Sequence, residues 1–322
     1  MNNFFTSLAV TALPFISLSQ SFAPPAGQPG STAIHKDSSV FLAWATHCEV
    51  QRGYMNIEDP SLGYASFGNE TDATGPAGGT TTSVVSLGDG GTATLTFDGP
   101  ITNGNGPDFA IFENGLSDTF LEIGFVEVSS DGQHFVRFPA VSEVQTDTQI
   151  GGFGSIDCRY IHNFAGKYRV GYGTPFDLED LKDSAGIDLN AVTHVRIVDA
   201  IGSIDPTYAT YDSQGTIVNN LHPTPFESSG FDLDAVGLIH VGTVSLEQKE
   251  TSIFALYPNP ATTTITVQSQ QPGDYTVTTM MGKVVLSGEL TTATHLINIS
   301  DLKTGIYFLS TVNGQCLKFV KK

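Results

Sequence analysis

Short runs of β-branched and aromatic residues, separated by glycine, asparagine and proline, recur along the chain and favour an all-β fold. The clearest run, residues 92–97 (TATLTF), alternates polar and apolar side chains with the period of two that is typical of a half-buried strand. Turns at 88–91 and 98–100 bound it on both sides. The 34 glycines and 16 prolines among 322 residues are frequent enough to end strands every few positions.

Residues 39–245 are predicted to form one β-sandwich domain of the jelly-roll type, because many short strands occur with almost no helix. A helix is expected only at 177–182, which follows Pro175. Strands are expected at 84–87, 92–97, 108–113, 120–129, 134–138, 192–198 and 231–241.

The first 23 residues have the pattern of a signal peptide. Residues 4–16 are largely apolar, and Ser21 and Ala23 offer small side chains at positions −3 and −1 of a cleavage site. We therefore expect cleavage near Ala23 and passage through the periplasm. Residues 24–38, rich in Pro, Gly and Ser, are predicted to be a flexible lead-in. The apolar stretch is too short to span a bilayer, and the mature form is predicted to have no transmembrane segment.

Charge is distributed unevenly along the chain. The net charge is −19, residues 1–23 carry no charged side chain, and residues 249–322 have six Lys and four acids. The part between them therefore holds eight basic and 29 acidic residues, a net charge of −21. This excess argues against nucleic acid as a partner.

Residues 253–322 are predicted to form a small antiparallel sandwich of their own. Alternating β runs at 262–267, 275–278, 284–286, 295–299 and 306–309 are separated by turns at 281–283 and 303–305. Several motifs of this segment, in this order and spacing, resemble the type A C-terminal sorting domain of type IX secretion in Bacteroidetes. They are Tyr257, Pro258, Asn259 and Pro260, then Gly282 and Lys283, then Gly305 and Tyr307, and finally the basic end of the chain.

The resemblance implies an Ig-like β-sandwich that acts as an export address. It implies contact with the type IX secretion machinery, transfer to the outer cell surface or medium, removal of the tail, and attachment of the remaining domain to lipopolysaccharide. Residues 246–252 are then the linker and cleavage region.

Residues 40–242 show a second resemblance, carried by the runs DFAIFEN at 108–114, SSDG at 129–132 and FDLDAV at 231–236. This order is similar to that of bacterial surface proteins with discoidin-like, galactose-binding-type jelly rolls of unknown function. The resemblance implies a sandwich that binds a ligand or carbohydrate, with calcium as a structural cofactor.

One group of polar residues fits such a calcium site. Asp232 and Asp234 are two apart on a predicted strand, so they share a face about 7 Å apart, together with Val236 and Leu238. We expect Glu113 or Asn114, at the end of another strand, to meet them around a cation, since calcium prefers carboxylate and carbonyl oxygens. The alternative is that Glu113 pairs with an arginine such as Arg196 and the two aspartates face water.

The sequence favours a protein that is not an enzyme. It has no zinc-helix histidine spacing, no nucleophile elbow and no phosphate loop. A carboxylate pair for hydrolysis remains an alternative, and so does a purely structural or adhesive role. Four tyrosines are candidates for stacking on a sugar ring, although such residues also cover sandwich edges: Tyr168, Tyr172, Tyr208 and Tyr211.

The three cysteines are an odd number for an exported protein. Removal of the tail would take Cys316 away and leave Cys48 and Cys158. A disulfide between these two would close a loop of about 110 residues, worth roughly 4–5 kcal/mol on the chain-entropy model. Two buried free thiols are the alternative.

The sorting resemblance predicts that the tail is absent from the displayed protein. Mass spectrometry of the surface-exposed form should find no peptide C-terminal to about residue 255. Recovery of an intact C-terminus at Lys322 would contradict the prediction.

Overall fold

The computed structural model describes residues 22–242, 254–269, 272–291, 293–311 and 315–322. The chain divides into two compact units, Met1–Val244 and Ser245–Lys322. The expected linker 246–252 and nearly all of the expected signal peptide lie outside the described residues. No described helix is long and apolar enough to cross a membrane.

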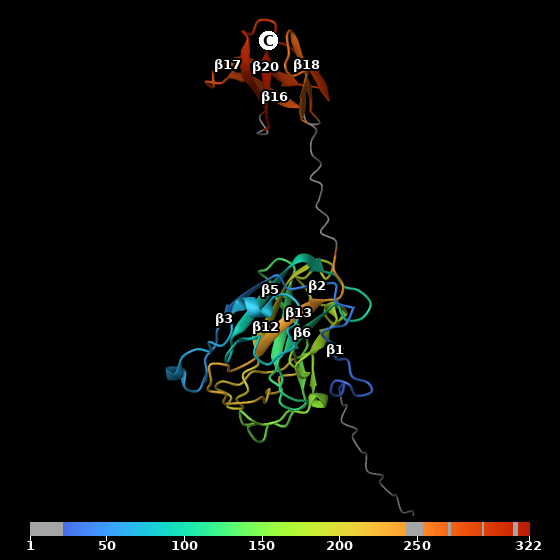
Figure 1. Cartoon of the computed structure of the whole chain (residues 1–322), viewed down its shortest axis with the longest axis vertical. Coiled ribbons are helices and arrows are strands. Elements are labelled where there is room, and N and C mark those ends of the chain that lie inside the picture. The colour runs from blue at the N-terminus through green and yellow to red at the C-terminus, as the bar shows by residue number, and fades with distance from the viewer. Residues whose placement is uncertain (1–21, 243–253, 270–271, 292, 312–314) are drawn as a thin grey trace, which may run out of the picture. The chain divides into compact units, whose positions relative to one another are not determined.

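The described part of the N-terminal unit is built mainly on two antiparallel sheets (Figure 1). The first has the order β1-β11-β6-β13-β2, with β4 pairing an end of β13. Its strands are β1 (Ile34–His35), β11 (Tyr172–Phe176), β6 (Phe109–Glu113), β13 (Asp232–Leu238), β2 (Ala43–Trp44) and β4 (Val85–Ser86).

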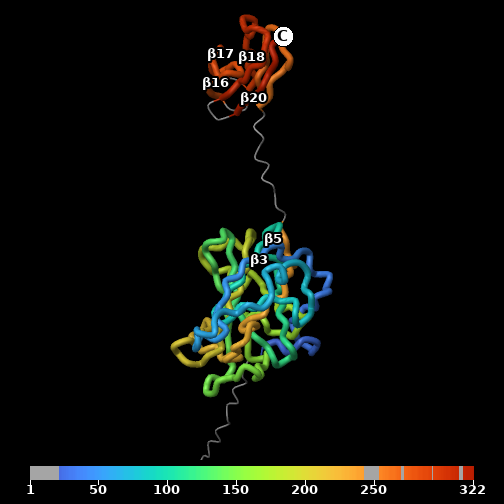
Figure 2. Tube along the Cα trace, turned by 60° about the vertical axis from the view of Figure 1, so that its left-hand side comes forward, coloured from blue at the N-terminus to red at the C-terminus, as the bar shows by residue number. Residues whose placement is uncertain are grey.

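The second sheet has the order β3-β5-β12-β7-β8. Figure 2 shows β3 and β5 side by side, in agreement with their antiparallel register. The strands are β3 (His47–Gln51), β5 (Thr92–Ile101), β12 (Val192–Asp199), β7 (Gly124–Ser129) and β8 (Val136–Arg137). A separate short pair joins β9 (Val141–Ser142) to β10 (Ile161–His162).

The core of this unit contains side chains from both sheets. Ala93 and Leu95 of β5 are buried in this core. The threonines that alternate with them along the strand are only half buried, as the pattern in the sequence predicts. Phe109 and Ile111 of β6 reach the same core from the other sheet. The β-sandwich expected from the sequence is confirmed.

The face of β13 differs from the expected alternation. Leu233, Val236 and Leu238 all belong to the core between the sheets, while Ala235 packs in a different cluster. The register against β6 shifts between Leu233 and Ala235, which is a β-bulge. The prediction that Val236 and Leu238 share the face of Asp232 is therefore wrong, because the extra residue exchanges the faces beyond it.

The predicted flexible lead-in at 24–38 is ordered by packing. Ala26 is buried in a second apolar cluster beside the sandwich, and β1 pairs with β11. The Thr32 hydroxyl lies 2.7 Å from the Tyr168 hydroxyl. These contacts fix a segment whose composition alone suggests flexibility.

Single turns of 3₁₀ helix take the place of longer helices. The expected helix at 177–182 is the short η4 (Leu178–Leu181), which Asp177 caps by accepting a hydrogen bond from the Glu179 amide. The other turns are η1 (Pro60–Leu62), η2 (Glu70–Ala73) and η3 (Cys158–Tyr160).

The described part of the C-terminal unit is a small sandwich with sheet orders β14-β15-β18 and β17-β16-β19-β20. It has a core of its own, formed by residues such as Ile265, Val277 and Phe319. Its strands are β14 (Ala255–Tyr257), β15 (Thr264–Gln268), β16 (Gly273–Thr279), β17 (Val284–Leu290), β18 (Thr294–Asn298), β19 (Gly305–Thr311) and β20 (Cys316–Lys321).

The motif residues of the tail hold this small sandwich together. Asn259 donates from Nδ2 to the Lys318 carbonyl and accepts from the Val320 amide through Oδ1, both at 2.9 Å. The Tyr307 hydroxyl donates to the Lys303 carbonyl at 2.8 Å. Gly282 occupies a turn with φ of 76°, a conformation that glycine adopts without strain.

The expected disulfide is absent from the structure, which has Cys48 and Cys158 as free thiols. Cys48 lies in the core between the sheets and Cys158 in the second apolar cluster, so they are buried in different places. The structure thus agrees with the alternative of two buried thiols. Burial raises the pKa of Cys48 to about 12, which keeps it protonated and unreactive.

Thiol titration checks this assignment on the full chain without reductant. A disulfide reagent should modify one thiol of the native protein, the exposed Cys316, because the other two are buried. Three thiols should react after unfolding in guanidinium. A single reactive thiol in the unfolded chain would show that Cys48 and Cys158 are bridged.

Candidate functional site

Three strands meet where β6 ends and β13 begins, and they bring acidic side chains together. Glu113, the last residue of β6, pairs in register with Leu233. Asp232, the first residue of β13, pairs with Ser86 of β4. The strand ends that carry Glu113 and Asp232 are therefore neighbours, and the sandwich buries both carboxyl groups.

Asp232 is held by two hydrogen-bond donors. The Ser86 hydroxyl donates to Oδ1, and Asn114 Nδ2 donates to Oδ2 at 3.0 Å. The second hydrogen of the Asn114 amide goes to the Thr81 carbonyl at 3.1 Å. Burial raises the pKa of Asp232 to about 6, although both donors lower it.

Glu113 is only half satisfied. Its Oε2 accepts the Gly115 amide at 2.7 Å, while Oε1 has no hydrogen-bond partner although the side chain is 1% exposed. Burial raises the pKa of Glu113 well above its usual value, and the neighbouring charge of Asp232 adds to the increase. A buried carboxylate oxygen without a partner is energetically unfavourable unless the group is protonated or paired.

Glu122 is a third carboxyl group in the same place, and sequence reasoning missed it. It is half buried just before β7 and makes no hydrogen bond or ion pair with another described residue. Burial raises its pKa well above the usual value, with further contributions from Asp232 and Glu113. The available signal was its position as the one charged residue in the apolar run FLEIGF at 120–125.

Arginines near this group bind elsewhere. Arg52 donates to the carbonyls of Phe67 at 2.8 Å and Gly68 at 2.7 Å, although its charge still lowers the pKa of Asp232. Arg196, the alternative partner of Glu113, instead forms an ion pair with Glu127. Among the described residues, no ion pair reaches Glu113, Glu122 or Asp232.

Asp234, the other member of the expected group, has separate partners. Its two oxygens accept the amides of Gly78 at 2.9 Å and Gly79 at 3.0 Å. The structure thus brings Glu113, Asn114 and Asp232 together and directs Asp234 to a loop.

These partners do not fit the expected calcium site. Calcium takes six to eight oxygen ligands, but Asp232 and Asp234 bind different groups: the oxygens of Asp232 accept from Ser86 and Asn114, and those of Asp234 accept from the loop at 78–79. Among the described residues, no group of three or more His, Cys, Asp or Glu side chains is arranged to hold a metal ion. Calcium stays a prediction.

A pocket of about 340 Å³ opens beside the acidic group, and Asn114, Glu122 and Asp232 form part of its wall. Apolar side chains form much of the rest. Phe153 is 81% exposed and Phe226 46% exposed, and their ring centroids lie 5.8 Å apart. We refer to it as the carboxylate–phenylalanine pocket, and its lining is Phe67, Thr81, Asn114, Leu116, Phe120, Glu122, Gly152, Phe153, Thr224, Phe226, Ser228 and Asp232.

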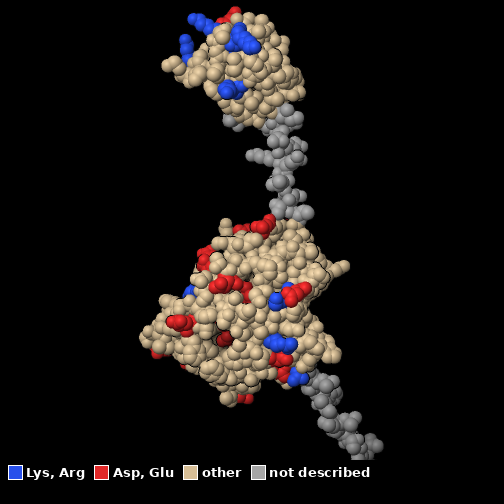
Figure 3. Space-filling model, in the orientation of Figure 1, with Lys and Arg blue, Asp and Glu red and all other residues tan. Residues whose placement is uncertain are grey.

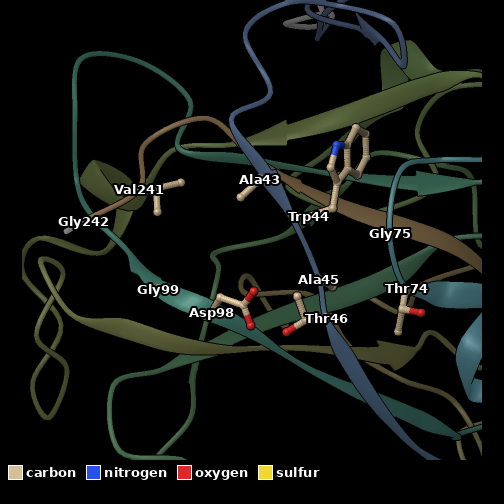
Figure 4. Close-up of a pocket in the computed structure, with 10 residues that line it drawn as sticks. All are labelled: Ala43, Trp44, Ala45, Thr46, Thr74, Gly75, Asp98, Gly99, Val241 and Gly242. Carbon is tan, nitrogen blue, oxygen red and sulfur yellow. The ribbon is translucent and has the colours of Figure 1, made fainter. Parts of the chain in front are cut away.

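A larger hollow of about 680 Å³ lies near Trp44 (Figure 4). Of the described residues that line this hollow, Asp98 is the one ionisable group. The Trp44 ring points away from the other lining residues. Without convergent polar groups, this hollow is the weaker candidate for a binding site.

The four candidate tyrosines do not form a stacking platform. Tyr168 is 2% exposed and belongs to the second apolar cluster, so the prediction that it contacts a ligand is wrong. Tyr172 is half buried on β11, where the Arg169 guanidinium lies 4.8 Å from its ring centroid. Tyr208 is half buried and Tyr211 exposed, and neither lines the carboxylate–phenylalanine pocket.

The charge contrast between the two units is visible on their surfaces. On the face shown in Figure 3, acidic side chains are prominent on the N-terminal unit and lysines on the C-terminal unit. This agrees with the charge distribution of the sequence, in which the excess of acids lies before residue 249.

The C-terminal unit has a known class. Residues 255–322 match the family model of the secretion system C-terminal sorting domain. These residues are therefore a sorting domain of the type IX secretion system, and the chain is a protein exported to the cell surface or secreted. Comparison with curated proteins gives no match.

Similarities to solved structures are remote. They include PorZ, a surface component of the type IX secretion system of Porphyromonas gingivalis, at 13% identity over 42% of this chain and 23% of that one, with a TM-score of 0.19. The BSP domain of a biofilm-associated protein has 11% identity over 72% of this chain and 48% of that one, with a TM-score of 0.20.

A β-glucuronidase of Ruminococcus gnavus has 10% identity over 71% of this chain and 35% of that one, with a TM-score of 0.18. The chain thus spans less than half of the length of each of these three structures. Such low TM-scores support no argument about the N-terminal unit.

The raised pKa of Glu113 predicts a pH-dependent stability. Because the folded protein holds this proton more tightly than the unfolded chain, the contribution of Glu113 to stability is fully present below about pH 4.5 and is lost as the pH rises through the folded pKa. Glu113→Gln should therefore raise the melting temperature at pH 8, by about 2–4 °C for each kcal/mol added to the free energy of unfolding. It should also make the melting temperature less dependent on pH.

Glu127→Gln is the matched control, because Glu127 pairs with Arg137 at 2.7 Å and with Arg196. It should lower the melting temperature at pH 8. Equal destabilisation by the two substitutions, measured by thermal denaturation between pH 5 and 8, would show that Glu113 is charged and satisfied in the fold.

Proposed function

We propose that the N-terminal unit is a surface-displayed, non-catalytic β-sandwich that binds an extracellular ligand, such as a glycan, in the carboxylate–phenylalanine pocket. The observation that carries the proposal is that the exposed Phe153 and Phe226 line the same pocket as carboxyl groups that form no ion pair with the described residues. Export to the surface gives such a pocket access to extracellular ligands.

Exposed aromatic rings support a binding role. A phenylalanine that is 81% exposed gains almost nothing from folding, and clustered apolar side chains on a surface are typical of interaction sites. The pocket of about 340 Å³ lies at the small end of the range for ligand sites. Its carboxyl oxygens can accept hydrogen bonds from hydroxyl groups, and its rings can cover an apolar face of a sugar.

The sorting domain supports the rest of the proposal. Residues 255–322 would bring the chain to the type IX secretion machinery, and the N-terminal unit would be attached to lipopolysaccharide after removal of the tail. Both steps extend the family assignment and belong to the proposal.

One observation favours a second candidate, a hydrolase that uses a carboxylate pair. Glu122 and Asp232 line the same pocket and both have raised pKa values, as acid catalysts often do. Turnover of a polysaccharide, lost in Glu122→Gln or Asp232→Asn, would support this candidate.

Substitution of the exposed rings tests the binding proposal. In a glycan-array screen, Phe153→Ala with Phe226→Ala should reduce binding of any glycan that the unchanged protein retains by about tenfold or more, because aromatic packing contributes about 0.5–1.5 kcal/mol per pair beyond the burial of apolar area. Tyr211→Ala is the control, because Tyr211 is 46% exposed but lies outside the pocket. Equal loss in both variants, or no retained glycan, would contradict a glycan ligand in this pocket.

A further inference from the structure

The carboxylate–phenylalanine pocket gathers carboxyl groups that no basic residue of the described chain pairs with. Glu122 and Asp232 line it, and Glu113, which pairs in register with Leu233, is in electrostatic contact with Asp232. None of its described lining residues is Lys, Arg or His. Arg52 is in electrostatic contact with Asp232, but its guanidinium donates hydrogen bonds to backbone carbonyls.

Two acceptors in this group have no donor from the protein. Glu113 Oε1 is fully buried without a hydrogen bond, and the Glu122 carboxyl makes none with the described residues. Like charges in a buried site repel one another unless they are protonated or meet a cation. Of these two groups, Glu122 lines the pocket, so its carboxyl oxygens favour a ligand that brings positive charge and N–H donors.

The other wall of the pocket fits the same kind of ligand. The rings of Phe153 and Phe226 are exposed and Leu116 is 63% exposed, so an apolar body would find cover there. The face of an aromatic ring attracts a cation, whereas phenylalanine offers no hydrogen bond to a neutral hydroxyl group. A pocket lined by both carboxyl groups and aromatic rings thus distinguishes an organic cation from a neutral ligand of the same shape.

A bare metal ion fits this wall less well. Within the described part of the chain, no group of three or more His, Cys, Asp or Glu side chains is arranged to hold a metal ion. Phenylalanine and leucine side chains supply no ligand to a metal, but they cover the carbon atoms of an organic cation.

We propose that the pocket binds an organic ammonium group, with Glu122 and Asp232 as its anionic partners and Phe153 and Phe226 as the rings that cover it. This assignment rests on the proposed ligand pocket and specifies the class of ligand. The ammonium group enters beside Glu122, and its apolar body lies against the exposed rings.

A pair of probes of similar shape tests this assignment on the full chain. Benzylammonium carries a positive charge at pH 7.5, and benzyl alcohol is its neutral counterpart. Isothermal titration should give a dissociation constant for benzylammonium about tenfold or more below that for benzyl alcohol, as a partly desolvated charge interaction of about 1–2 kcal/mol predicts.

Substitutions separate the contribution of the carboxyl group to binding from that of the aromatic rings. Glu122→Gln removes a group that can ionise opposite an ammonium ligand and breaks no described hydrogen bond, so it should fold normally and bring the affinities of the two probes to within about threefold of each other. Phe153→Ala should weaken both probes. Asp98→Asn, in the separate hollow near Trp44, is the charge-matched control and should change neither.

The affinities of the two probes decide between three kinds of ligand. Equal affinity of the two probes overturns the ammonium assignment but leaves the proposed pocket intact if Phe153→Ala still weakens both. Absence of binding by either probe, with no glycan retained on the array, overturns the pocket as well. An increase in melting temperature with calcium, lost in Glu122→Gln and without any preference for benzylammonium, overturns the ammonium assignment in favour of a metal.

Discussion

The complete burial of β13 is the constraint on which the N-terminal unit depends. All seven residues of this strand are buried, and it pairs with β6, β2 and β4. Two of the seven are aspartates, and a buried carboxylate is tolerated only with donors or a proton. The loop at 78–79, Ser86 and Asn114 therefore have to meet β13, and this requirement fixes the surrounding turns.

The bulge at the start of β13 reconciles the two aspartates with the core. Without it, the alternation of side chains would place Asp232 and Asp234 on the same face as Val236 and Leu238, which pack between the sheets. One extra residue lets the apolar half of the strand enter the core while both acids find polar partners. The same arrangement concentrates negative charge at the edge of the pocket.

Strands with clear alternation could be predicted from the sequence, and those with mixed composition could not. The threonine and apolar pattern of β5 and the runs of the sorting domain indicate both period and bounds. The strand β11 contains Gly173 and Pro175, and β1 has two residues, so neither carries a periodic signal. The bulge near Asp234 cannot be predicted from composition, because a strand with one extra residue has the same kinds of residue as a regular strand.

The candidate site was only partly predictable for a related reason. Glu113, Asn114 and Asp232 stand at strand ends, where polar residues attract attention. Phe153 and Phe226 lie 73 positions apart in loops, and only the folded chain brings their rings within 5.8 Å. In the sequence, Glu122 is a single charged residue in an apolar run. Its role becomes visible only when the structure shows that it is half buried beside other acids.

Asn259 gives the export signal an unexpected property. Asn259 follows β14 and binds the backbone of β20, so its arrangement depends on residues 318 and 320. A chain without β20 would retain Asn259 and lack both of its backbone partners. The arrangement of the motif around Asn259 therefore depends on the folded sandwich as well as on its own residues.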